Sequence, residues 1–307
     1  MTSITLAGIL LYLGVVCFIL LFILNQKKNL NFYTFGEVDI AFLIYILVFV
    51  LSKTINSGIE TGFYTFFRMC QDYFIYLWIV FYLCKNSKNS KFIQTAILIA
   101  ASVSVFYGLL QFFHFDFFHR QVNVDRLSGF HKNPYTYSGQ LIILFFFLTP
   151  VLFTMMLHRR VFKRIKKVVL PTPEPNIRFK LWGIALSVWK RNILFGTDKF
   201  PVVAYQAVGT FPVKYLTHAH NVYLQILVTN GLVGFLSFIN LFYAVLKTAF
   251  YSLKSNKYAG SLISVLLAFL IEGIFEYFWG DSEVRYLLLY YIGFVLGNSL
   301  ELNLKKV

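Results

Sequence analysis

The sequence predicts an all-α, polytopic membrane protein, a bundle of about eight transmembrane helices. Of its 307 residues, 58% are hydrophobic and 20% are aromatic, which exceeds the apolar content of soluble domains of this length. The apolar residues gather in separate runs, and about 20 helical residues cross roughly 30 Å of hydrocarbon. We therefore interpret residues 1–307 as one membrane domain.

The apolar runs define the predicted spans in chain order. The first run lacks a basic leader and precedes further apolar runs, so we interpret it as a retained helix rather than a signal peptide. The short second and third runs are extended by their flanking residues. The predicted spans are 4–24, 39–52, 73–84, 92–113, 138–157, 230–250, 259–278 and 284–300.

Basic segments orient these spans, because Lys and Arg concentrate in cytoplasmic loops. The turn 85–91 and the run 158–167 carry only positive charge, so both are expected inside. Residues 114–137 then form a first outer loop. Counting back from Lys305 and Lys306 at the other end places 178–229 in a second outer loop.

The two halves of this topology disagree at the connector 158–177, which is basic and rich in proline. The chain must cross the membrane an odd number of times between the run 158–167 and the second outer loop. No stretch there approaches 18 apolar residues. Either one half is inverted, or an irregular segment crosses, or spans are missing from this chain.

The formal net charge of +15 is explained by these loops, and nucleic acid is not an expected partner. The cysteines Cys17, Cys70 and Cys84 lie in or beside apolar runs without ligand spacing. The sequence therefore predicts no metal, cofactor or disulfide framework. Membrane lipids are expected partners, with the basic run 158–167 against anionic headgroups.

Three motifs in the outer segments carry groups suited to chemistry. The first is Arg126 to Pro134, with Arg-Leu-Ser-Gly followed by Asn-Pro. The second is the stretch 178–191, whose tryptophans and basic ends suit an amphipathic helix in the membrane interface. The third is His218-Ala219-His220-Asn221, which leads into a helix punctuated by glycines.

With these three motifs in this order, the chain resembles the O-antigen ligase and O-antigen polymerase family of bacterial inner-membrane glycosyltransferases. The resemblance implies metal-independent transfer of a glycan from undecaprenyl diphosphate to an acceptor hydroxyl at the periplasmic face. In the ligases the acceptor is a sugar of the lipid A core, and relatives use a growing glycan or a protein hydroxyl. The family normally places further spans between the Asn-Pro motif and the second arginine, so this chain resembles a shortened member.

The residue chemistry agrees with that reaction. An arginine fork binds a diphosphate leaving group bidentately and stays charged, which favours Arg126 and Arg178 as diphosphate ligands. A sugar hydroxyl needs a base that titrates near neutrality, as histidine does. We favour His220 as this base, with His218 as its partner or alternative.

Other residues are candidates for a supporting role, namely Asn221, Lys180, Arg191 and Glu272. Glu272 and Glu276 lie one helical turn apart in a predicted span, where carboxylates either bind substrate, pair with an arginine or join helices. Arg126 and Arg178 could equally contact lipid headgroups or anchor an interfacial helix.

The sequence thus favours an O-antigen ligase-like enzyme and leaves three alternatives. The first is a polymerase of the same family. The second is a non-catalytic carrier that binds polyprenyl-linked glycans through the same arginines. The third is an inactive, shortened remnant.

Overall fold

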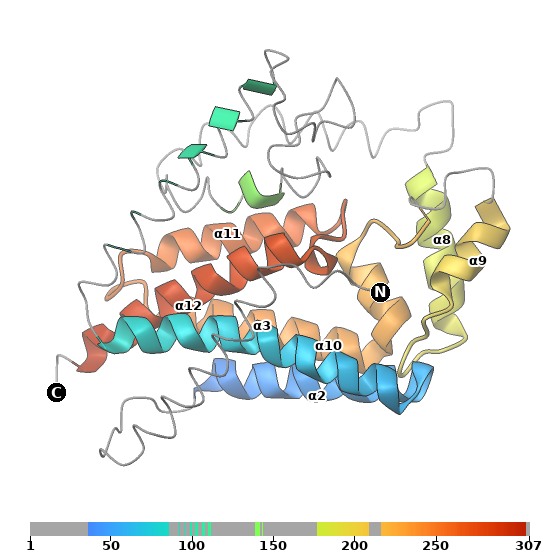
Figure 1. Cartoon of the computed structure of the whole chain (residues 1–307), viewed down its shortest axis with the longest axis horizontal. Helices are drawn as coiled ribbons and strands as arrows, with labels where there is room; N and C mark the ends of the chain where they lie inside the picture. The colour runs from blue at the N-terminus through green and yellow to red at the C-terminus, as the bar shows by residue number, and fades with distance from the viewer. Residues whose placement is uncertain are drawn as a thin grey trace.

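The computed structural model describes residues 36–85, single positions within 92–111 and 139–143, and the segments 177–208 and 216–304. All regular structure in these residues is helical, which confirms the all-α class. Figure 1 shows long helices running along one bundle and two shorter ones at one end. The long helices are α2 (Glu37–Ser57), α3 (Ile59–Lys85), α10 (Val222–Tyr251) and α12 (Ser282–Leu304).

Four predicted spans coincide with helices: 39–52 lies in α2, 73–84 in α3, 230–250 in α10 and 284–300 in α12. Among the described residues, α2 and α10 are both long and apolar enough to cross a membrane. The run 4–24 and most of 92–113 and 138–157 lie outside the described residues. The number of about eight spans therefore stays a prediction.

The predicted span 259–278 is wrong at its end. Helix α11 (Ala259–Glu272) stops early, and the short helix η3 (Phe278–Gly280) follows a turn. Gly273 caps α11, and its carbonyl accepts a hydrogen bond from the amide of Val222 at 2.7 Å. The Gly273 carbonyl thus bonds to the start of α10 instead of to a further turn of α11.

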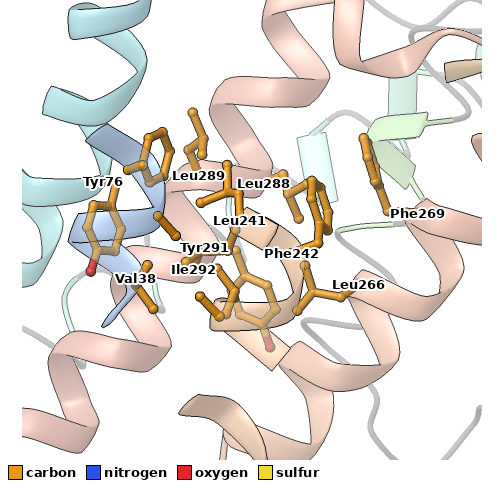
Figure 2. Close-up of a cluster of buried hydrophobic side chains, with 14 of the residues drawn as sticks. Val38, Tyr76, Leu241, Phe242, Leu266, Phe269, Leu288, Leu289, Tyr291 and Ile292 are labelled. Carbon is orange, nitrogen blue, oxygen red and sulfur yellow. The ribbon is translucent and has the colours of Figure 1, made fainter. Parts of the chain in front are cut away.

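The main core lies between the long helices. Helix α3 packs along α12, and α2 packs against both α3 and α10. Figure 2 shows side chains from α2, α3, α10, α11 and α12 meeting in one apolar cluster. Aromatic rings fill much of it: Phe42 stacks on Tyr76, and Phe242 stacks on Phe269, with ring centroids 5.6 and 5.8 Å apart.

A second, smaller core joins α8 (Ile177–Lys190) and α9 (Phe200–Val208) to the bundle. Leu181, Ala185 and Val188 recur at helical spacing and are buried, so one face of α8 is apolar. That face packs with α9 and with Val228 of α10. The predicted helix at 178–191 is confirmed, and its apolar side contacts protein.

Candidate functional site

The two histidines lie in the short segment that leads into α10. Asn221 caps the helix, since its side-chain oxygen accepts the Leu224 amide at 2.9 Å. Just before the cap, His220 has a φ of 48°. A left-handed residue other than glycine costs roughly 1–3 kcal/mol and is typical of functional sites. The entry to α10 therefore turns sharply at His220.

The turn after α11 is tied to this entry by two hydrogen bonds. The Val222 amide donates to the Gly273 carbonyl, and the Asn221 side chain donates to the Ile274 carbonyl at 2.9 Å. The far side of the turn is held by Arg285, which donates to the Trp279 carbonyl at 2.7 Å and pairs with the buried Asp72. These bonds place Glu276 beside the histidines.

Glu276 is the centre of a cluster of ionisable groups. Its carboxylate oxygens lie 2.9 and 3.1 Å from Nδ1 of His220. Nδ1 of His218 is 3.9 Å from the same carboxylate, and Nη2 of Arg178 is 3.8 Å from it. The two imidazole centroids are 4.1 Å apart, and His218 also lies against the ring of Tyr277.

Arg178 reaches this cluster because α8 docks its first turns on the histidine segment. The indole of Trp182 donates to the carbonyl of Ala219, between the two histidines, at 3.1 Å. Leu181 and Ala219 are both buried in the smaller core. The second arginine motif and the histidine motif thus meet in space.

Burial is the main influence on the pKa of His218. It lowers the pKa of His218 from 6.5 to about 4, assisted by the neighbouring His220 and opposed by Glu276. Burial raises the pKa of Glu276, but the hydrogen bond and charge of His220 outweigh it and hold that pKa below its ordinary value. At neutral pH, His218 is therefore neutral and Glu276 is ionised.

We expect acid to destabilise the fold through this cluster. Between pH 6.5 and about 4 the unfolded chain protonates His218 whereas the folded chain does not, so stability falls as pH drops through this window. With allowance for screening at this 29% exposed side chain, the loss at pH 5 is about 1 kcal/mol, or roughly 2 to 4 °C in Tm. Thermal unfolding at pH 7.5 and 5 tests this. His218→Gln should weaken the dependence, and an unchanged slope would contradict it.

The same side chains could hold a metal ion. Ligand atoms of His218, His220 and Glu276 lie within 4.8 Å of one another, and two imidazoles with a carboxylate suit zinc. The Glu276 carboxylate is hydrogen-bonded to His220, and the positive charge of Arg178 lies close by. The geometry therefore fits an acid–base pair as well as a cation.

The other predicted site residues are placed differently. Lys180 is exposed on α8, and Arg191 follows the end of that helix, about 20 Å along it from Arg178. Glu272 ends α11, so Glu276 and not Glu272 faces His220. Arg126, the first outer loop 114–137 and nearly all of the connector 158–177 lie outside the described residues.

The site's segments coincide with a known protein family. A family model described as O-antigen ligase matches residues 73–239, more than half of the chain. The chain belongs to the O-antigen ligase family. The match includes both arginine motifs and the histidine motif, whereas Glu276 lies beyond it. A search of curated proteins gives no significant match.

Membership confirms the resemblance and settles the broad class. Proteins of the O-antigen ligase family are inner-membrane enzymes that transfer or polymerise glycans. The two apolar helices α2 and α10 agree with a membrane location for this member.

Proposed function

We propose that this O-antigen ligase-family protein transfers a glycan from undecaprenyl diphosphate to an acceptor hydroxyl at the periplasmic face. The favoured acceptor is a sugar of the lipid A core. The observation that carries the proposal is the convergence of Arg178, His220 and Glu276 from three separate segments. The proposal includes a multi-pass inner-membrane topology with both outer loops periplasmic.

In the proposed step, the acceptor oxygen attacks the anomeric carbon of the donor glycan. The bond from that carbon to the diphosphate oxygen breaks, and undecaprenyl diphosphate leaves with the electron pair. His220 takes the hydroxyl proton. An ionised carboxylate only accepts hydrogen bonds, so Glu276 keeps the His220 proton on Nδ1 and the basic lone pair on Nε2.

Arg178 is proposed to bind the diphosphate. Its guanidinium lies 3.8 Å from Glu276, longer than a strong bidentate pair, and its side chain is 22% exposed. A substrate phosphate that binds Arg178 would therefore lie near the histidines. Arg126 is proposed as the second diphosphate ligand, supplied by the first outer loop.

A reconstituted transfer assay tests the function. The protein in proteoliposomes would receive an undecaprenyl-diphosphate-linked glycan and a lipid A core acceptor. We expect a covalent glycan–core product and release of undecaprenyl diphosphate. Elongated carrier-linked glycan would instead indicate a polymerase. Tight donor binding without transfer would indicate a non-catalytic carrier. A protein that neither transfers glycan nor binds the donor would be an inactive remnant.

We also predict that the reaction needs no metal. The base and the diphosphate ligands are protein side chains, so EDTA should change the transfer rate by less than about twofold. The assay would be run before and after chelation and dialysis. A loss of activity that Zn²⁺ or Mg²⁺ restores would contradict this prediction and assign the His218, His220 and Glu276 set to a cation.

A further inference from the structure

Helix α10 is broken at Gly231, which has φ 68° and ψ −168°. Backbone groups at such a break need partners from elsewhere, and the turn after α8 supplies them. The amides of Leu232 and Val233 donate to the carbonyls of Ile193 and Leu194, at 2.8 and 3.3 Å. In return, the amide of Thr197 donates to the Val228 carbonyl at 2.6 Å.

Two glycines allow this contact between backbones. A Cβ atom on Gly231 would lie 2.1 Å from the Leu194 carbonyl oxygen, and one on Gly196 would lie 2.4 Å from the Val228 oxygen. Gly196 also has a positive φ of 69°. Side chains at these positions would separate the turn from the helix, so the two glycines are a matched pair.

The end of α2 closes the junction with polar side chains. The hydroxyl of Ser52 and the amide of Asn56 both donate to the Phe195 carbonyl, at 2.6 and 2.8 Å. Lys53 pairs with Asp198, and Ser57 hydrogen-bonds to the same carboxylate. We call this junction of the α2 end, the turn 193–198 and the Gly231 break the α2 lock.

Two helical segments, α8 and the part of α10 before Gly231, each have the α2 lock at one end and the candidate site at the other. Helix α8 has 14 residues and spans about 20 Å, with Arg178 in its first turn and the lock after its last. The part of α10 before the break begins next to His220 and ends at the lock. Figure 1 shows α8 and a bent α10 meeting the end of α2 at this edge of the bundle.

We propose that Ser52 and Asn56 are positioning residues, which hold α8 in register along α10 and thereby set the distance from Arg178 to the His220–Glu276 pair. The inference rests on the proposed function for its catalytic meaning. Both residues donate to the Phe195 carbonyl after α8 and, at 3.4 Å, to the Thr229 carbonyl just before the break in α10. A shift of about 1 Å between reacting groups can slow an enzyme about 10²-fold.

The first test measures geometry without activity. Spin labels on cysteines at the exposed positions Lys180 and Leu236 report the site end of α8 against the bundle, with the native cysteines replaced by serine. Ser52→Ala/Asn56→Ala should broaden or shift the distance distribution. Thr54→Ala is the matched control, because its hydroxyl bonds to Val50 within α2. A distribution as narrow as in the parent protein would overturn the proposal.

The second test measures coupling in transfer. Ser52→Ala/Asn56→Ala should lower kcat about tenfold. In an Arg178→Ala background the same two substitutions should lower kcat no further. General destabilisation would lower kcat in both backgrounds. Full additivity would overturn the positioning role. If the double variant does not accumulate, Asn56→Ala alone serves both tests. A parent protein that transfers no glycan would refute the proposed function. The distance measurement would still test whether Ser52 and Asn56 position α8.

Discussion

Replacement of His220 by alanine is expected to slow glycan transfer by about 10² to 10⁴ fold, the usual contribution of a positioned general base. Donor binding should survive, because the proposed diphosphate ligands Arg178 and Arg126 remain. The measurement is single-turnover transfer beside equilibrium binding of the undecaprenyl-diphosphate-linked glycan. Loss of transfer with retained binding is the signature of a catalytic base.

His218→Ala is the matched control for this variant. It removes the same kind of side chain two positions away, and Nδ1 of His218 lies 3.9 Å from Glu276 against 2.9 Å for His220. We expect a loss of about tenfold or less. Full activity of His220→Ala would favour the non-catalytic carrier, and a larger loss in His218→Ala would exchange the roles of the two histidines.

Glu276→Gln is expected to reduce transfer by about 10² to 10⁴ fold, since an orienting carboxylate fixes the tautomer of its histidine and stabilises the cation that forms. The amide keeps the size of the side chain but loses the charge that faces Nδ1 of His220. The pH–rate profile should change as well, because the amide does not ionise and so carries no charge beside the imidazole at any pH. Transfer rates from pH 5 to 9 measure both effects.

Glu272→Gln provides the control, with the same chemical change four residues earlier at the end of α11. We expect a smaller loss than in Glu276→Gln, because Glu272 is half-buried at the end of α11 and it is Glu276 that bonds to His220. Equal losses in the two variants would show that a general loss of negative charge, rather than the His220–Glu276 pair, lowers the rate.

Local patterns in the sequence predict much of this fold. Apolar runs locate α2, α3, α10 and α12, and the tryptophans and basic ends of the stretch 178–191 locate α8. The His-Asn motif marks the start of α10 because Asn221 is a good helix cap. Each of these features depends on neighbouring residues, and such features can be read without knowledge of the tertiary structure.

The partners at long range could not be predicted in this way. The apolar residues from 259 to 278 suggested one helix, since nothing local shows that the Gly273 carbonyl bonds to Val222. The sequence pattern therefore places Glu276 in a span and gives no sign of its contact with His220, 56 positions away. Gly196 and Gly231 likewise look like separate turn signals, and only the structure pairs them.

The central claim is that both arginine motifs and the histidine motif share one site at the periplasmic face. Single cysteines at Asp125, Lys180 and Thr217 lie in or beside these motifs and leave Arg126, Arg178 and His220 in place, and the latter two positions are exposed. A membrane-impermeant maleimide would be applied to cells with a permeabilised outer membrane, with the native cysteines replaced. We predict labelling of all three from the periplasmic side. Protection of Asp125→Cys with labelling of Thr217→Cys, reversed in inverted vesicles, would place the motifs on opposite faces and contradict the account.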